Sequence, residues 1–183
     1  DGGTASIEEF VPAQAALLYR EAVERGELSD REKFSVAVLS RLRSRTPEEL
    51  SRLRGLSEGL ENRLYGAIRQ AGDVDELYTL LKTKRYPHAR LRRLVLDAAM
   101  NVTADRMPRQ PPWLHVLGAR RTALAALRYA ELPASTSLAE LSRLSDESAA
   151  LCRLHSEFVD FSALCRVHTM PAGLAFTAKP VVL

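Results

Sequence analysis

Apolar residues recur at helical spacing along most of the chain. One stripe in the segment 57–71 consists of Leu60, Leu64, Ala67, Ile68 and Ala71, the spacing of a helix that faces a core. The segment after Pro87 repeats the pattern with Leu91, Leu94, Val95, Ala98, Ala99 and Val102. No convincing strand pairing and no repeat of fixed period is present. The pattern predicts an all-α fold, an irregular multi-helix domain of about eight or nine helices with an extended C-terminal tail.

Capping residues predict where these helices begin. The candidate first residues are Ser29, Thr46, Ser57, Asp73, Ser137 and Ser145. Pro87 favours a further helix start, and a helix of about twelve residues is expected between Gly118 and Ala130. Three prolines within 107–112 indicate a linker. We therefore expect a helical region at 1–106, which carries a basic loop, and a C-terminal helical subdomain with its tail at 113–183.

Composition places the chain among globular proteins. Of its 183 residues, 46% are hydrophobic and 27% are charged. It has no apolar run of about 18 residues, which excludes a membrane-spanning helix. Two cysteines are too few for a disulfide framework, so a cytoplasmic location is expected. The chain begins at Asp1 without a methionine, and we expect it to be a piece of a longer protein.

Charge is distributed unevenly along the sequence. Residues 41–128 carry a net charge of +9, whereas residues 1–40 carry −4 and residues 129–183 carry −2. Arginine supplies 22 of the 26 basic side chains. A basic centre between acidic flanks favours a polyanionic partner.

The basic charge is densest between residues 82 and 93. This stretch contains no acidic residue and six cations, namely Lys82, Lys84, Arg85, Arg90, Arg92 and Arg93. Such a cluster suits phosphate groups, and Tyr86 within it is a candidate for stacking on an unpaired base. The alternative is an ordinary solvated face in which Arg93 pairs with Asp97 at i+4. The loop alone favours neither interpretation over the other.

The sequence offers no motif for catalysis or metal binding. The pairs Cys152-x-x-His155 and Cys165-x-x-His168 have ligand-like spacing, but an uninterrupted helix would hold them roughly 20 Å apart. A Walker A loop, a Gly-x-Ser-x-Gly motif, a dinucleotide fingerprint and a His-x-Gly-His signature are all missing. We therefore expect neither a catalytic residue nor a metal ligand in this chain.

Three segments in this order resemble one protein family. They are Ser57-Glu58-Gly59-Leu60-Glu61-Asn62-Arg63-Leu64, Lys82-Thr83-Lys84-Arg85-Tyr86 and Ala89-Arg90-Leu91-x-Arg93. The similarity is to the carboxyl-terminal region of bacterial tRNA(Met) cytidine acetate ligases, a nucleotidyltransferase-like family. It extends over roughly residues 34–183, with further matches at Val116-Leu117-Gly118, Leu132-Pro133 and Gly173-x-x-Phe176-Thr177.

The resemblance implies a function for the basic segment. Members of the family use ATP with magnesium to convert acetate to acetyl-adenylate, and they then acetylate the wobble cytidine of elongator methionine tRNA. The resemblance assigns that chemistry to an amino-terminal nucleotidyltransferase domain, which we expect to be absent here and to be a partner of this chain. The chain is then a tRNA-binding domain that is inactive alone and has no cofactor of its own. The expected tRNA contacts are Lys82, Lys84, Arg85, Tyr86, Arg90 and Arg93.

Two other functions remain open at the level of sequence. The chain can be a helical protein-interaction module that docks an acidic partner or the missing catalytic domain. It can also be a paralogue that has kept the scaffold and acts on another nucleic acid. Steep weakening of binding with salt would favour a nucleic-acid partner over a mainly apolar docking surface.

Overall fold

A computed structural model describes residues 9–56 and 59–182 of the chain. Its α-helices are α1 (Ala13–Glu24), α2 (Arg31–Arg43), α3 (Pro47–Ser51), α4 (Leu60–Gln70), α5 (Val74–Leu81), α6 (His88–Ala99), α7 (Leu138–Leu141), α8 (Asp146–Leu164) and α9 (Leu174–Thr177). Two 3₁₀-helices are η1 (Ala104–Arg106) and η2 (Arg121–Tyr129). Four short strands are β1 (Leu114–His115), β2 (Gly118–Ala119), β3 (Ala134–Ser135) and β4 (Val181–Val182).

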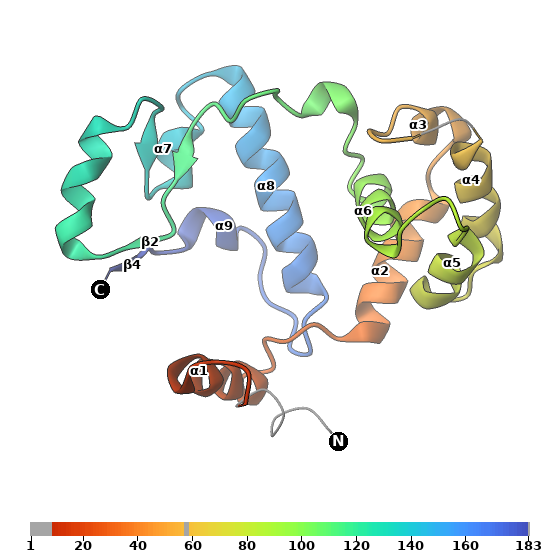
Figure 1. The fold of residues 1–183 in the computed structure, drawn as a ribbon, viewed down its shortest axis with the longest axis horizontal. Coiled ribbons are helices and arrows are strands. Elements are labelled where there is room, and N and C mark those ends of the chain that lie inside the picture. Colours follow the sequence, from red (N-terminus) through yellow and green to blue (C-terminus); the bar gives the residue numbers. More distant parts are fainter. Residues whose placement is uncertain (1–8, 57–58, 183) are drawn as a thin grey trace.

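Helices α2 to α6 form a helical body around one apolar core (Figure 1). The stripes predicted from the sequence face this core, and the burial expected for five of their residues is confirmed: Leu60, Leu64, Leu91, Leu94 and Val95. Helix α8 closes one side of the core, where Phe34 of α2 meets Phe161 edge to face at 6.1 Å between ring centroids. Burial of these apolar faces is the main force that orders the body.

Capping residues set the helix starts largely as predicted. Thr46 accepts a hydrogen bond from the Glu49 amide at 3.2 Å, and the Glu49 carboxylate accepts one from the Thr46 amide, which completes a capping box. Asp73 caps α5 by accepting from the Glu76 amide at 2.7 Å. The prediction of Ser29 as the cap of α2 is wrong, because the neighbouring Asp30 accepts from the Lys33 amide. The predicted cap Ser57 lies outside the described residues.

The distal region, residues 113–182, has a small core of its own. Leu138, Leu141, Cys152 and Ala175 are buried together there, with Trp113 packed against them. Helix α8 of this region lies on the side that faces the helical body (Figure 1), and its residues Leu154 and Phe161 belong to the core of that body. Among the residues that the structure describes, no helix is long and apolar enough to cross a membrane.

The prediction of an all-α fold is wrong. Strand β1 pairs with β3 and β2 pairs with β4, in each case parallel. Each strand has two residues, too few to show the alternation by which a strand is recognised. The pairing also joins segments that are distant in the sequence, such as Gly118 and Val181. A hairpin turn, which would indicate a pairing of neighbouring strands, is therefore not involved. The tail beyond Pro171 contains α9 and β4 and is not extended throughout.

Candidate nucleic-acid interface

The basic turn, residues 82–86, connects α5 to α6 and has a fixed backbone. Thr83 and Tyr86 form an antiparallel bridge, which leaves Lys84 and Arg85 at the tip. The Arg85 amide donates a hydrogen bond to Thr83 Oγ1 at 3.2 Å, a local bond typical of turns that contain threonine. Lys82, Lys84 and Arg85 are exposed. The turn therefore presents three cations from an ordered backbone.

Arg63 of α4 supports this turn from below. Its Nε and Nη2 donate to the Leu80 carbonyl at 3.1 and 2.7 Å, and Nη2 also reaches the Lys82 carbonyl at 3.3 Å. The last carbonyls of a helix have no partner within it, so the guanidinium satisfies groups at the end of α5. The sequence showed Arg63 only as part of a family motif. Its positioning role depends on a contact 17 residues away, which periodicity does not reveal.

Tyr86 lies beneath the basic surface and is not presented to a base. The residue is buried, with 8% of its surface exposed. The guanidinium carbons of Arg90 and Arg85 lie 4.9 and 5.6 Å from its ring centroid, a cation–π arrangement. In this geometry the ring holds two arginines in place. The expected stacking of Tyr86 on an unpaired base therefore does not fit the structure, because guanidinium groups and packed neighbours occupy its surroundings.

Arg90 and Arg93 on α6 have different surroundings. Arg90 Nη2 donates to the Gly55 carbonyl at 2.8 Å, which ties the first turn of α6 to the loop after α3. Arg93 is exposed, and no hydrogen bond or ion pair joins it to any described residue. The two arginines line a hollow of about 200 Å³ together with Arg54, Gly55, Leu94 and Asp97.

Asp97 forms its ion pair with Arg54 and not with Arg93. Arg54 Nε and Nη2 donate to Asp97 Oδ2 and Oδ1 at 2.8 and 3.0 Å, a bidentate pair. Hydrogen bonding to this buried carboxylate raises the pKa of Arg54. The i+4 pairing of Arg93 with Asp97, which would make the basic segment an ordinary face, is therefore not formed.

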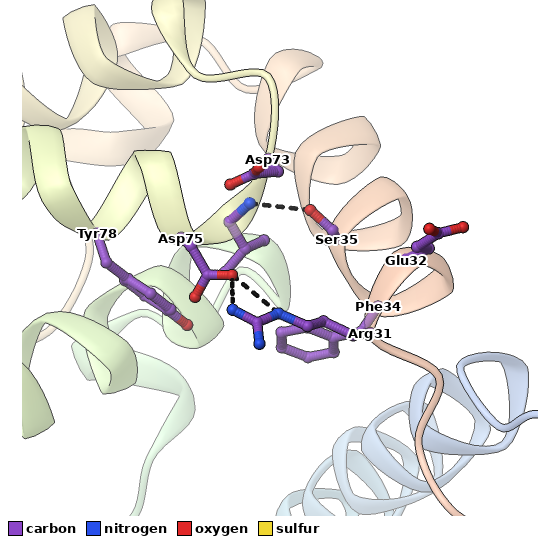
Figure 2. A pocket seen from close by; sticks show the side chains of 8 residues that line it. Arg31, Glu32, Phe34, Ser35, Asp73, Asp75 and Tyr78 are labelled. Carbon is purple, nitrogen blue, oxygen red and sulfur yellow. Dashed lines mark hydrogen bonds and ion pairs between the residues drawn. The ribbon is translucent and has the colours of Figure 1, made fainter. Parts of the chain in front are cut away.

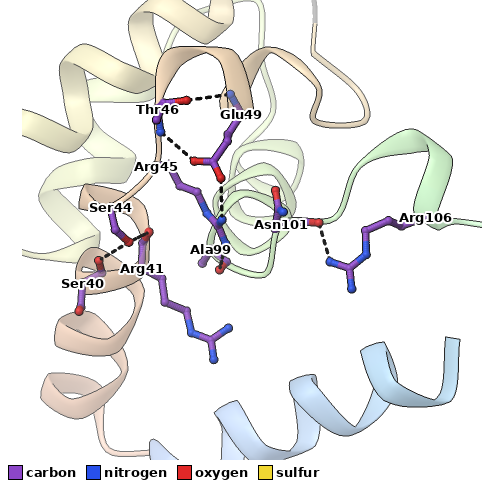
Figure 3. A network of polar contacts seen from close by, with 9 residues as sticks. All are labelled: Ser40, Arg41, Ser44, Arg45, Thr46, Glu49, Ala99, Asn101 and Arg106. Atoms are coloured by element: carbon purple, nitrogen blue, oxygen red, sulfur yellow. Dashed lines mark hydrogen bonds and ion pairs between the residues drawn. The ribbon is translucent and has the colours of Figure 1, made fainter. Parts of the chain in front are cut away.

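Other arginines of the chain form hydrogen bonds or ion pairs within the protein. Figure 3 shows Arg45 between Glu49 and the Ala99 carbonyl. Arg106 Nη1 donates to the Asn101 carbonyl at 2.9 Å. Arg31 and Asp75 line a pocket of about 250 Å³ and pair with each other (Figure 2). In the same pocket the Val74 amide donates a hydrogen bond to Ser35 Oγ. In contrast, the side chains of Lys82, Lys84 and Arg93 have no such partner within 9–56 and 59–182.

The cysteine and histidine pairs lie apart from this surface. Cys152 lies within α8, and Cys165 follows its last residue; both thiols are free and buried. Burial raises the pKa of each thiol. His168 Nδ1 lies 3.0 Å from the Arg25 carbonyl, whereas the ring of His155 meets that of His115. Across the described ranges, no three His, Cys, Asp or Glu residues are grouped as metal ligands would be.

Comparison with known proteins gives one family. The sequence model described as HIGH Nucleotidyl Transferase matches residues 2–166. A tRNA(Met) cytidine acetate ligase from Staphylococcus haemolyticus is 28% identical over 146 residues, which cover 80% of this chain and 37% of the relative. The ligase from Pediococcus pentosaceus is 34% identical over 83 residues, which cover 45% of this chain and 23% of the relative.

Two solved structures share the fold. Thermotoga maritima TmcAL in its apo form superposes with a TM-score of 0.83 at 21% identity, over 94% of this chain and 46% of that one. TmcAL bound with alpha-thio ATP gives 0.86 at 22% identity, over 98% of this chain and 48% of that one. The chain thus spans about half the length of these structures, and less than half of the two curated relatives.

These comparisons correct the expected identity. The interpretation as a carboxyl-terminal region without a nucleotidyltransferase domain is wrong, because the nucleotidyltransferase model matches 2–166. The same match overturns both functions derived from it, a C-terminal tRNA-binding domain and an interaction module that docks a missing catalytic domain. The expected absence of a cofactor in this chain is likewise unsupported.

The prediction failed because of the kind of signal on which it relied. Short contiguous nucleotide-binding motifs are missing, but family similarity here is spread over most of the sequence and does not depend on them. The family model matches residues 2–166, far more than half of the chain. The chain belongs to the HIGH nucleotidyl transferase family.

Proposed function

We propose that this chain acts in the ATP-dependent acetylation of a cytidine in methionine tRNA, and that its basic turn contacts the tRNA backbone. The observation that carries the proposal is a set of exposed cations without carboxylate partners among the described residues, held on an ordered turn and on the helix that follows it. Its members are Lys82, Lys84, Arg85 and Arg93. Unpaired cations that repel one another favour an anionic partner, and a polyphosphate backbone offers several anions to such a set.

The residues around the turn divide the work between contact and positioning. The lysine side chains of the turn are free to follow phosphate oxygens, whereas Arg85 lies against the Tyr86 ring and Arg90 is also bonded to Gly55, so these two arginines have fixed positions. Arg63 keeps the turn at the end of α5. Such contacts position a tRNA and carry no sequence information by themselves.

Similarity to known proteins supports the identity of the nucleotide and of the acetyl donor. A TmcAL structure bound with alpha-thio ATP supports ATP as the nucleotide. Mg²⁺ is the ion that nucleotide phosphates commonly bring to such sites. The curated relatives are named tRNA(Met) cytidine acetate ligases, which supports acetate and methionine tRNA as the other substrates. In the reaction expected from the family, an acetate oxygen attacks the α-phosphorus and displaces pyrophosphate. The cytidine amine then takes the acetyl group and AMP leaves.

Filter binding of methionine tRNA tests the contact directly. The double substitution Lys84→Ala/Arg85→Ala should weaken binding about tenfold or more, because a hydrogen bond to a charged group contributes about 1.5–3 kcal/mol. Arg31→Ala is the matched control, since it removes an exposed arginine whose partner is Asp75. It should bind tRNA as the wild type does. Equal affinities of the wild type and the double variant would contradict the proposed contact.

A second assay separates the chemistry from the contact. With ATP, magnesium and labelled acetate, the protein should transfer label to methionine tRNA, and omission of ATP should abolish the transfer. Acetate-dependent exchange of pyrophosphate into ATP reports the first step alone. Intact tRNA binding without exchange or transfer would remove the acetylation part of the proposal and leave the RNA contact.

A further inference from the structure

A second exposed basic segment lies far from the basic turn. We call residues 116–133 the arm; they connect β1 to β3 and include β2 and η2. Two hydrogen bonds close its base, from the Leu114 amide to the Pro133 carbonyl at 2.8 Å and from the Val116 amide to the Ser135 carbonyl at 2.9 Å. A third, from the Val181 amide to the Leu117 carbonyl at 3.0 Å, fastens it to the tail. Figure 1 shows the arm at the end of the molecule opposite α4 and α5.

Helix η2 displays two outward faces. A 3₁₀-helix has three residues per turn, so side chains three apart lie on the same face. The half-buried positions within and just after η2 are Leu124, Leu127 and Ala130, and this spacing of three defines the inner face. Arg128 and Tyr129 therefore lie on the two outer faces. Nine residues of 3₁₀-helix are unusual, since such runs rarely exceed four.

The outer faces combine arginine, alanine and one aromatic ring. Tyr129 has 74% of its surface exposed, and the Arg128 guanidinium carbon lies 4.8 Å from its ring centroid. On the tyrosine face, Ala123 and Ala126 leave a flat surface between Tyr129 and Arg120, which begins the same face about 18 Å away at roughly 2 Å per residue. The Arg128 guanidinium thus lies over the ring, which is otherwise largely exposed and has only small side chains along its own face.

The arm also has a one-sided charge. The 25 residues from Arg106 to Ala130 include five arginines and no aspartate or glutamate. Arg120, Arg121 and Arg128 are exposed, and within the described part of the chain none of them has a carboxylate partner. An exposed aromatic ring in a basic surface is the arrangement by which proteins bind single-stranded nucleic acid, through stacking and phosphate contact together.

We propose that the arm is a second RNA contact, in which Tyr129 stacks on an unpaired base, Arg128 binds the adjoining phosphate, and Arg120, about 18 Å away on the tyrosine face, binds a phosphate further along the strand. This inference rests on the proposed function, since it takes tRNA as the partner. Tyr129 offers what Tyr86 cannot, because the ring of Tyr86 is buried. A paired base has its faces covered by its neighbours in the helix, so the ring selects a loop or an end of the RNA. The arm therefore adds selection for unpaired bases to the phosphate contacts of the basic turn.

Binding assays with three RNAs test this proposal. The RNAs are methionine tRNA, a single-stranded oligonucleotide and an RNA duplex of the same composition. Tyr129→Ala should weaken binding to the first two by about five- to 150-fold, the range for one stacked base, and leave the duplex unchanged. Tyr129→Phe keeps the ring and should restore binding. Leu117→Ala, an exposed apolar change on the same arm, is the control and should have no effect.

The salt dependence distinguishes the ring from the arginines. Removal of the neutral Tyr129 ring releases no counterion, so the salt slope should stay the same, whereas Arg128→Ala should make it shallower. Wild-type affinity of Tyr129→Ala, beside a weakened Lys84→Ala/Arg85→Ala, would overturn the arm contact and leave the proposed function standing. An equal loss on the duplex would overturn base stacking. Failure of the wild type to bind tRNA would overturn both proposals.

Discussion

The helical body and the arm are stabilised by different interactions. In the body, helices α2 to α6 bury continuous apolar stripes, and Leu64, Leu77 and Leu91 have no exposed surface. In the arm, η2 has no buried residue, and its base is held by backbone hydrogen bonds to two-residue strands. The body can therefore support an ordered basic turn at its edge, whereas the arm offers its side chains to the outside. Packing fixes one region, and a few backbone bonds fix the other.

The largest expected effect distinguishes the two kinds of region by stability. Leu94→Ala should lower the free energy of unfolding by about 2–5 kcal/mol, because it removes a buried side chain and leaves a cavity. Leu117→Ala in the arm should change it by less than about 0.5 kcal/mol, as for most exposed positions. Urea denaturation measures both values. Similar losses for the two leucines would show that the arm is as firmly packed as the body.

The next effect concerns the ion pair beside the basic surface. Arg54→Ala should cost about 1–3 kcal/mol of unfolding free energy, because the buried carboxylate of Asp97 loses both hydrogen-bond donors. Arg93→Ala removes the same charge from the same hollow and should cost almost nothing, because Arg93 has no described partner. Thermal unfolding of the two variants checks this. A larger loss of stability for Arg93→Ala than for Arg54→Ala would show that the Asp97 carboxylate pairs with Arg93, and would contradict the ion pair of Asp97 with Arg54.

The smallest effect comes from His155 in the distal region. Partial burial of the ring, and then the charge of His115, lower the pKa of His155, although much of its surface stays exposed, so the folded state favours the neutral ring. The unfolded chain then binds the proton more readily, and stability is lost as the pH falls through about 6.5 toward the lower folded pKa. His155→Gln should reduce the decrease in melting temperature between pH 8 and pH 5 slightly, since the residue is exposed. An unchanged pH profile would remove this contribution.

Sequence periodicity predicted the body well and the distal region poorly. The stripes through Leu60 and Leu91 have enough turns to establish a period, and the caps at Thr46 and Asp73 depend on residues three positions apart. The strands at Leu114 and Gly118 depend on partners 20 and 63 residues away, which leave no local pattern. The helix predicted before Ala130 is 3₁₀, since propensity does not fix the hydrogen-bond register.

The sequence indicated which residues make up the candidate site, but it did not indicate the contacts that those residues form. Charge density identified Lys82 to Arg93, and this needs no knowledge of the fold. The supporting contacts join α4 or the loop after α3 to the basic turn and α6, as with Arg63 on the Lys82 carbonyl and Arg54 on Asp97. The burial of Tyr86 likewise depends on how α5 and α6 pack. Which arginines are free and which are structural is a property of the fold.

The salt dependence of tRNA binding tests the central claim most directly, namely that unpaired cations on the basic turn bind RNA phosphates. Filter binding of methionine tRNA from about 50 to 200 mM salt gives the slope of log affinity against log salt. The slope of Lys84→Ala/Arg85→Ala should be shallower than that of the wild type by about 1.4 to 1.8 units, for two lost phosphate contacts. Its melting temperature should stay unchanged. Parallel slopes for the two proteins would contradict the claim, whatever the difference in affinity.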